Sequence, residues 1–164
     1  MKTWRTKLLG AECKVMRLQD APTPEQCRVA DNPETIIAYL QSQLPGSIAY
    51  RPDTENLIVI YLTTRRWPIT WQVISNGTLD TLLVHPREIF KGAMVLNAAA
   101  IVLAHNHPSS DPTPSEADIK VTRDLIRAGQ LLKIDVLDHV IMGQPGPHNA
   151  KGWASLRELG YFYT

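Results

Sequence analysis

The first clear pattern along the chain is helical. Apolar residues recur at spacings of three and four, which places them on one face of a helix: Ile36, Ile37, Leu40 and Leu44. Asn32 precedes them as a helix N-cap, and Pro33 suits the first helical position. The Pro-Gly pair at 45–46 favours the end of this helix. The pattern therefore predicts a helix from residue 33 to about residue 44.

The next apolar runs read first as strands and then as a helix. β-branched and aromatic residues fill positions 56–64 and 69–75 with only a short turn between them, so a hairpin is expected. A helix then opens at Pro86, and its apolar side would carry Ile89, Phe90, Ala93 and Met94.

The second half of the chain continues this alternation. Residues 97–104 form an apolar run that predicts a buried strand ending at His105. A helix is expected over about 114–128 with Gly129 ending it, followed by a strand over 134–143. Strands and helices in this order predict an α/β fold with a mixed central β-sheet and flanking helices.

Composition supports one domain. A chain of 164 residues with 44% apolar content is long enough for a single core and short for two. Residues 1–30 mix short apolar stretches with prolines, and we interpret them as an N-terminal arm or edge strand. Residues 31–164 would form the domain.

Charge and cysteine content narrow the setting. Seventeen basic and sixteen acidic residues give a net charge of +1, so nucleic-acid binding is neither implied nor excluded. The N-terminus lacks the apolar core of a signal peptide, and the uncharged run at 93–104 is too short to span a bilayer. Cys13 and Cys27 lie far apart with no CxxC spacing, which favours reduced thiols, with a disulfide between them as the alternative. We predict a cytoplasmic protein without a membrane segment.

The stretch HNHPSSDPTPSEAD, residues 105–118, carries the candidate chemistry. Residues i and i+2 at the end of a strand project to the same side, so His105 and His107 can present their imidazoles together. Ser115 and Asp118, three apart on the following helix, share a face. Two imidazoles and one carboxylate suit Zn²⁺ and leave a fourth position open, as in catalytic zinc sites.

Each part of this stretch also has a simpler interpretation. A lone His-x-His is more often a solvated turn than a metal site. Ser115 and Asp118 alone are typical of a helix capping box, although Thr113 with Glu116 three residues later fits the same role. The metal interpretation is favoured by the conjunction of histidines at strand period with a helical Ser and Asp after a proline-stiffened turn.

The spacing of this stretch resembles the JAMM signature of MPN/JAB-type metalloproteases. Its form is similar to that of the RadC family, and the resemblance extends over roughly Asp31 to Leu159, including the segment LLKIDVLDHVIMG. It implies the MPN (JAB1/MPN, cytidine-deaminase-like) fold. Ser110 stands where RadC-like sequences usually have glycine. The helix-hairpin-helix segment of longer RadC proteins has no counterpart in residues 1–30, so its DNA binding is not carried over.

The resemblance also implies roles for individual residues. It implies a zinc site with His105, His107 and Asp118 as ligands, and Ser115 as a hydrogen-bonding support for the tetrahedral intermediate. It further implies a glutamate general base, and Glu55, directly before the strand NLIVIYL, matches that position.

Other polar residues have ordinary interpretations. Glu88 competes with Glu55 as a base, but it falls in the first turn of a helix, where the helix dipole already accounts for a carboxylate. His139 is interpreted as a strand-surface or satisfied core histidine, and His85 and His148 as turn or loop residues. Asp111 fits an ordinary turn and is an alternative partner near the metal.

These observations favour a zinc-dependent hydrolase that cuts an amide or isopeptide bond in a protein or peptide substrate. A metal-dependent nuclease or DNA-repair accessory is one alternative, and a non-catalytic interaction module containing zinc is another. The sequence specifies neither the substrate nor the oligomeric state.

Overall fold

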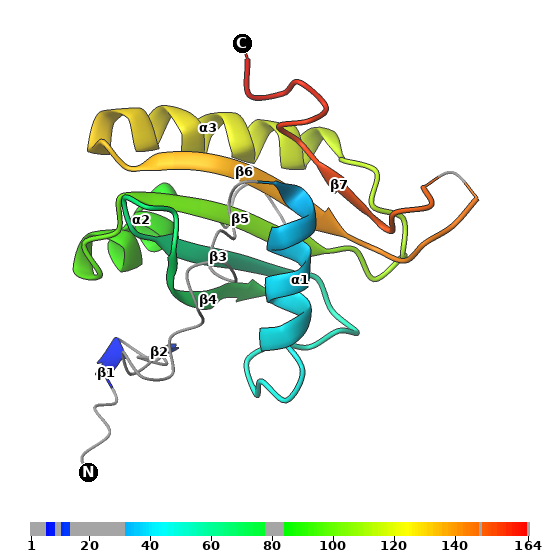
Figure 1. The fold of residues 1–164 in the computed structure, drawn as a ribbon, viewed down its shortest axis with the longest axis horizontal. Coiled ribbons are helices and arrows are strands. Elements are labelled where there is room, and N and C mark those ends of the chain that lie inside the picture. The colour runs from blue at the N-terminus through cyan, green and yellow to red at the C-terminus, as the bar shows by residue number, and fades with distance from the viewer. Residues whose placement is uncertain (1–5, 9–10, 14–31, 78–83, 148, 164) are drawn as a thin grey trace.

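The computed structural model describes residues 6–8, 11–13, 32–77, 84–147 and 149–163, which form a layered α/β structure (Figure 1). The elements in chain order are β1 (Thr6–Leu8), β2 (Ala11–Cys13), α1 (Pro33–Gln43), β3 (Asn56–Leu62), β4 (Pro68–Asn76), α2 (Pro86–Val95), β5 (Ala100–Asn106), α3 (Glu116–Leu132), β6 (Asp135–Met142) and β7 (Trp153–Ser155).

Five strands form the central sheet in the order β4-β3-β5-β6-β7. β3 pairs antiparallel with both β4 and β5, whereas β5 and β6 are parallel and are connected through α3. β7 closes the other edge antiparallel to β6. The sheet is therefore mixed and flanked by helices, which confirms the predicted fold class and the predicted β3–β4 hairpin.

Each face of the sheet has its own apolar core. Alternate residues of β3 point to opposite faces, and β3 and β5 are buried along their whole length. One face packs under α1, with a core that includes Ile36, Leu40, Ile58, Ile60, Val102 and Val140. The opposite face packs under α2 and α3, with a core that includes Leu57, Val59, Tyr61, Phe90, Leu103 and Leu125. The central strands consequently have no solvent-facing side except at their ends.

The first helix begins as the sequence predicts. The Asn32 side chain accepts a hydrogen bond of 2.8 Å from the Thr35 backbone N–H, and Pro33 occupies the first turn. Leu44 is the C-cap and is buried.

The start of α3 differs from one of the two predictions. Ser115 is the N-cap, and Ser115 and Asp118 form a full capping box, so the assignment of Thr113 as the cap was wrong. Thr113 serves the preceding turn instead. Its backbone N–H and its hydroxyl donate to Asp111 Oδ1 at 3.0 and 2.7 Å. The hydroxyl that would cap a helix at Thr113 is therefore already used.

Two further predictions about helices are corrected. α3 does not end at Gly129 but runs to Leu132, and Lys133 takes the left-handed conformation that closes it, with φ 57°. Gly129 lies inside the helix, because the chain folds back there and the carbonyl oxygen of Ile134 occupies the space of a side chain. In α2, Met94 is 56% exposed and does not share the buried side of Ile89 and Phe90.

The N-terminal strands β1 and β2 pair with each other as a separate two-stranded sheet and do not join the central one. β2 lies beside β4. Within the described ranges, no helix combines the length and the apolar character needed to cross a bilayer.

Replacing Gly129 with alanine tests the packing at the end of α3. Alanine normally stabilises a helix interior relative to glycine by about 1 kcal/mol. Here the new Cβ would meet the Ile134 carbonyl oxygen and come within 3.3 Å of the Phe90 ring. We expect Gly129→Ala to lower the free energy of unfolding by about 1 to 3 kcal/mol, as overpacking does.

The measurement is chemical denaturation, with Gln130→Ala as the control, since Gln130 is the exposed next residue of the same helix. A Gly129→Ala protein as stable as the control, or more stable than the parent chain, would contradict this packing.

Candidate metal centre

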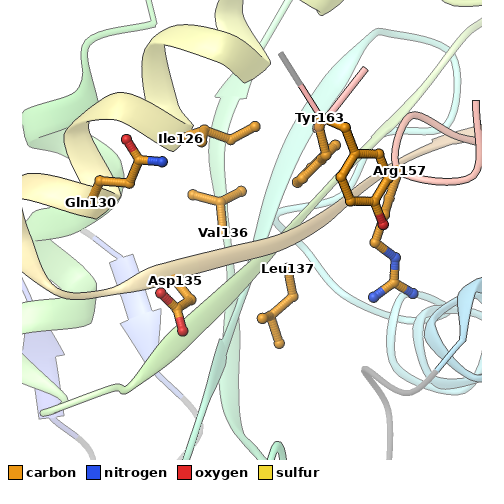
Figure 2. Close-up of a pocket in the computed structure, with 8 residues that line it drawn as sticks. Ile126, Gln130, Asp135, Val136, Leu137, Arg157 and Tyr163 are labelled. Carbon is orange, nitrogen blue, oxygen red and sulfur yellow. The ribbon is translucent and has the colours of Figure 1, made fainter. Parts of the chain in front are cut away.

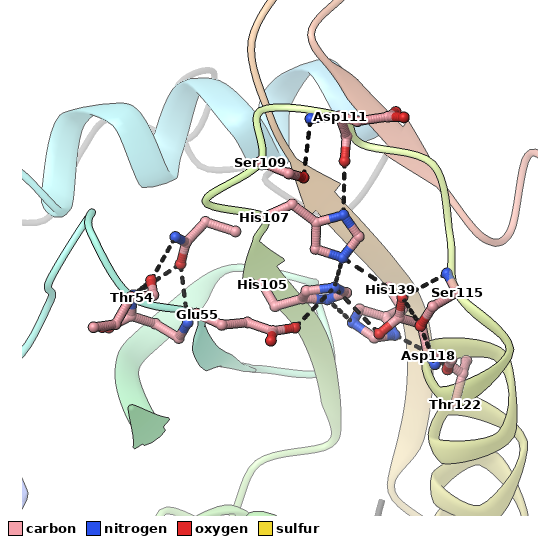
Figure 3. A network of polar contacts seen from close by, with 12 residues as sticks. Thr54, Glu55, His105, His107, Ser109, Asp111, Ser115, Asp118, Thr122 and His139 are labelled. Carbon is pink, nitrogen blue, oxygen red and sulfur yellow. Dashed lines mark hydrogen bonds and ion pairs between the residues drawn. The ribbon is translucent and has the colours of Figure 1, made fainter. Parts of the chain in front are cut away.

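Four side chains meet where β3, β5 and α3 come together (Figure 3). They are Glu55, His105, His107 and Asp118, and each offers a ligand atom that lies within 4.8 Å of those of the others. His105 is the second-last residue of β5, His107 follows the strand, and Asp118 is in the first turn of α3. The structure thus brings together the three residues expected as metal ligands and the glutamate expected as a base.

The pairing of β3 with β5 places Glu55. Leu57 lies opposite His105 in the antiparallel register. Glu55 stands two residues before Leu57, so it has the same facing and extends beyond the end of the paired segment, over the histidines. A shift of one residue in this register would turn Glu55 to the α1 face.

The distances within the cluster are shortest between the two histidines and longest to Glu55. His105 Nε2 lies 2.8 Å from His107 Nε2, and 3.3 Å from Asp118 Oδ1. His107 Nε2 lies 3.6 Å from Asp118 Oδ2. Glu55 Oε1 is farther, at 4.0 Å from His105 Nε2. The two imidazoles and Asp118 therefore form the tight part of the cluster, with Glu55 beside them.

Exposure shows on which side the cluster opens. The side chains of His105 and Asp118 are 0% and 1% exposed, whereas those of His107 and Glu55 are 16% and 19% exposed. A molecule arriving from solvent would reach the cluster past His107 and Glu55.

Asp118 belongs to the helix cap and to the cluster at once. Its Oδ2 accepts hydrogen bonds from the backbone N–H and the hydroxyl of Ser115 at 2.7 and 2.6 Å, while its Oδ1 is the atom nearest His105. Burial raises the pKa of Asp118, but the contacts with His107, His105 and Ser115 outweigh burial and hold that pKa well below its usual value. The carboxylate is therefore ionised at neutral pH.

The Nδ1 atoms of His105 and His107, which point away from the cluster, both have hydrogen-bonding partners. His107 Nδ1 lies 2.7 Å from the backbone carbonyl oxygen of Asp111. His105 Nδ1 lies 2.8 Å from His139 Nε2, and His139 Nδ1 lies 2.6 Å from Thr122 Oγ1. Partners of this kind orient metal-binding histidines in known sites.

The surroundings move the pKa values of these histidines in different directions. Burial, together with the neighbouring His139, lowers the pKa of His105 well below its usual value. Burial lowers the pKa of His139 to about 4. The nearby Asp118 carboxylate raises the pKa of His107. His105 and His139 are consequently neutral at pH 7, which is the form of imidazole that binds metals.

A pair of buried asparagines holds the backbone on the opposite face of the sheet. Asn106 Oδ1 accepts from the backbone N–H and the side-chain amide of Asn56 at 3.0 and 2.8 Å. Asn106 Nδ2 donates to the Thr54 carbonyl oxygen at 2.8 Å. Asn106 lies between the two histidines in the chain, and Glu55 lies between Thr54 and Asn56. These bonds therefore link the glutamate to the histidine strand directly beneath the cluster.

Sequence reasoning left His139 as either a strand-surface or a satisfied core histidine; the structure buries it, and sequence reasoning missed its contact with His105. The available signal was an imidazole in the middle of the apolar strand IDVLDHVIMG, which must find a polar partner when buried. A second signal was Thr122, one helical turn after Asp118 and on the same face of α3. For Asp111, the contact with His107 is made by the backbone carbonyl, which side-chain chemistry does not predict.

The other polar residues that were weighed as site residues are not part of the cluster. The Glu88 side chain is 52% exposed and forms ion pairs with Arg87 and Lys91. His85 is the N-cap of α2 without a side-chain capping bond, and His148 lies outside the described residues.

A pocket of about 320 Å³ lies between α3, β6 and the C-terminal segment (Figure 2). Its lining consists of Ile126, Gln130, Asp135, Val136, Leu137, Arg157, Phe162 and Tyr163. None of the four cluster residues is among them, so this pocket and the cluster are separate features.

The donor chemistry of the cluster fits a metal ion. Imidazole nitrogens and carboxylate oxygens are the ligands of Zn²⁺ and of other divalent transition metals. The ligand atoms converge from one strand end and one helix start, and the buried ones are already oriented by hydrogen bonds. The residues present could therefore hold a metal ion.

Comparison with known proteins gives a consistent result. The model of the family described as "RadC-like JAB domain" matches residues 30–161. A UPF0758 protein of Syntrophomonas wolfei is 52% identical over 92 residues, which is 56% of this chain and 39% of that protein. A UPF0758 protein of Caldanaerobacter subterraneus is 47% identical over 131 residues, which is 80% of this chain and 52% of that protein.

A third relative, the UPF0758 protein of Symbiobacterium thermophilum, is 41% identical over 129 residues, or 79% of this chain and 50% of that protein. The chain thus spans about half the length of these relatives, or less. The matched region includes β3, β5, α3 and all four cluster residues. The family model covers most of the chain, and the chain therefore belongs to the RadC-like JAB domain family.

Proposed function

We propose that the chain is a zinc-dependent hydrolase of the JAMM type, a metallopeptidase or isopeptidase that cuts an amide bond with water. One observation carries this proposal. Two histidine Nε2 atoms and a buried, ionised carboxylate lie 2.8 to 3.6 Å from one another, and a second carboxylate, that of Glu55, stands beside them at the open side.

His105, His107 and Asp118 are the proposed zinc ligands. Zinc favours four-coordinate sites with nitrogen and oxygen donors, and three protein ligands leave one position for water or substrate. When bound, zinc supplies a positive charge that brings the pKa of a water molecule to near neutrality and polarises a carbonyl group.

Glu55 is the proposed general base. It is farther from the histidines than Asp118 is, at 4.0 Å against 3.3 Å from His105 Nε2, and it is the most exposed of the four. Both features fit a general base at the open side of the cluster better than they fit a metal ligand. Glu55 would take a proton from water as the water oxygen bonds to the amide carbon, and return it to the nitrogen as the carbon–nitrogen bond breaks.

Ser115 is proposed to assist the reaction by hydrogen bonding to the tetrahedral intermediate. In the structure its hydroxyl donates to Asp118 Oδ2 at 2.6 Å and its oxygen accepts from the Asp118 backbone N–H at 3.2 Å. Donation to an intermediate would require the hydroxyl proton to turn away from Asp118. The capping bond to the oxygen would persist through that rotation.

The substrate class is proposed as protein or peptide in a non-membrane setting. The near-neutral charge of +1 gives no electrostatic footprint for a phosphate backbone. A nuclease and a non-catalytic zinc module are outcomes that the experiments below separate from this proposal.

Zinc binding by the parent chain and by His107→Ala tests the ligand set. We expect the parent chain to bind about one zinc ion, as a single three-ligand site requires. Loss of a residue that only hydrogen-bonds to a ligand lowers metal affinity by about 10- to 100-fold. Loss of a ligand itself should cost more, so we expect the zinc affinity of His107→Ala to fall by more than about 100-fold. The measurements are elemental analysis and competition with a chromophoric chelator.

Zinc should also raise the melting temperature of the parent chain and not that of the variant, since only the folded state binds it. The control is His85→Ala, which removes an exposed histidine at the start of α2. A parent chain that takes up no zinc, or a His107→Ala protein with unchanged affinity, would contradict the ligand assignment.

Glu55→Gln tests the base. Glutamine keeps the shape of the side chain but has no basic oxygen, so hydrolysis should fall by about 100-fold or more while zinc binding and folding persist. Hydrolysis is measured on a panel of peptides, isopeptide-linked proteins and nucleic acids, with and without chelator, because chelator sensitivity identifies the zinc-dependent activity. Glu88→Gln is the matched control, since Glu88 is exposed and outside the cluster.

Near-full activity of Glu55→Gln would show that the base is elsewhere, and loss of zinc would show that Glu55 is a ligand. Chelator-sensitive cleavage of nucleic acid alone would overturn the peptidase assignment in favour of a nuclease. Zinc binding with no cleavage of any substrate class would favour the non-catalytic module.

A further inference from the structure

A buried chain of hydrogen bonds runs from the back of His105 into α3 (Figure 3). His105 Nδ1 meets His139 Nε2 at 2.8 Å, and His139 Nδ1 meets Thr122 Oγ1 at 2.6 Å. Thr122 Oγ1 lies 2.6 Å from the backbone carbonyl oxygen of Asp118. His105, His139 and Thr122 are all 0% exposed, so water does not compete for these bonds.

The direction of each bond follows from the last one. A carbonyl oxygen carries no hydrogen, so two oxygens at 2.6 Å require the Thr122 hydroxyl proton to lie between them. Thr122 has no second proton to give, and its oxygen must therefore accept from His139. His139 consequently carries its proton on Nδ1.

The same reasoning reaches the metal cluster. His139 is 0% exposed, and its ring nitrogens contact His105 and Thr122, neither of which carries a negative charge that would offset a buried imidazolium. His139 is therefore neutral, and its Nε2 has a lone pair that accepts from His105. His105 then carries its proton on Nδ1, and its Nε2 presents a lone pair to His107 and Asp118. The carbonyl oxygen of Asp111 can only accept, so His107 also carries a proton on Nδ1, and its Nε2 presents a second lone pair once that atom has lost any proton of its own.

Two lone pairs that face each other at 2.8 Å repel unless a cation lies between or beside them. A proton can supply that charge, and so can a metal ion. If the His139 bonds ran in the opposite direction, His105 would point an N–H at the cluster and could not bind a metal there.

We propose that His139 and Thr122 are positioning residues that hold His105 in the Nδ1–H form, so that its Nε2 is free to bind a metal ion. The role in metal affinity rests on the proposed function, whereas the hydrogen-bond direction is a property of the metal-free chain. His139 reaches the cluster through His105, and Thr122 reaches it through His139 and through the backbone carbonyl of Asp118.

The first test reads the tautomers directly. Long-range proton–nitrogen correlation spectra of the metal-free, ¹⁵N-labelled chain at neutral pH distinguish Nδ1–H from Nε2–H imidazoles. We expect both His105 and His139 to show the Nδ1–H pattern. An Nε2–H pattern for His105 in the parent chain would overturn the proposal, whether or not the chain binds zinc.

The second test removes the hydroxyl that sets the direction. Thr122→Val keeps the shape of the side chain but leaves the His139 Nδ1 proton without an acceptor. We expect zinc affinity to fall by about 10- to 100-fold, as loss of such partners does. Thr122→Ser restores the hydroxyl and should recover most of the zinc affinity. The spectra should agree, with the Nδ1–H pattern of His105 and His139 retained in Thr122→Ser and weakened in Thr122→Val.

Val121→Ala separates this role from stability. Val121 is the neighbouring residue of α3, is 6% exposed and belongs to the apolar core, so its truncation should lower the melting temperature without changing zinc affinity. Should Thr122→Val bind zinc as tightly as the parent chain, or weaken it no more than Val121→Ala does, the positioning role is wrong.

A parent chain that binds no zinc would refute the proposed function and the affinity effect together. The spectra of the metal-free chain would still decide the hydrogen-bond direction.

Discussion

The antiparallel pairing of β3 with β5 is the constraint on which the candidate site depends. It sets Leu57 opposite His105 and so brings Glu55, from a segment fifty residues earlier, over the two histidines. The Asn56–Asn106 pair fastens the same strand ends from the opposite face. Because side chains alternate along a strand, Glu55 and His105 lie on one face of the sheet, and the neighbouring residues Asn56 and Asn106 form their hydrogen bonds on the other. The register and the site are therefore specified together.

α3 supplies the rest through its first two turns. The capping box turns Asp118 back toward the helix start, and one oxygen of the carboxylate remains directed at His105. One turn later Thr122 anchors His139, which anchors His105. Two interpretations of the Ser115–Asp118 pattern that looked like competitors, a helix cap and a metal-site carboxylate, thus describe the same side chain. The cap fixes the rotamer that places the carboxylate in the cluster.

Local and periodic signals predicted much of this structure. The helix start at Asn32 and Pro33, the β3–β4 hairpin and the mixed sheet follow from patterns that span a few residues. Predictions failed where another interaction competed with the expected one. Thr113 looked like a cap, but Asp111 had already taken its hydroxyl. Gly129 looked like a helix end, but its missing side chain makes room for the returning chain at Ile134. The His139 contact depends on β6 lying parallel beside β5, which no short stretch of sequence encodes.

In the proposed zinc site, two imidazoles, those of His105 and His107, bind the ion together with carboxylate and solvent oxygens, while His139 stays behind them. X-ray absorption at the zinc edge of the zinc-loaded chain tests this most directly, because the scattering pattern counts imidazole ligands and distinguishes sulfur from lighter atoms. We expect two imidazoles, oxygen donors in the remaining positions and no sulfur. Three imidazoles would show that His139 has joined the metal, and sulfur scattering would place the zinc at a cysteine instead. Either result would show that the proposed ligand set is wrong.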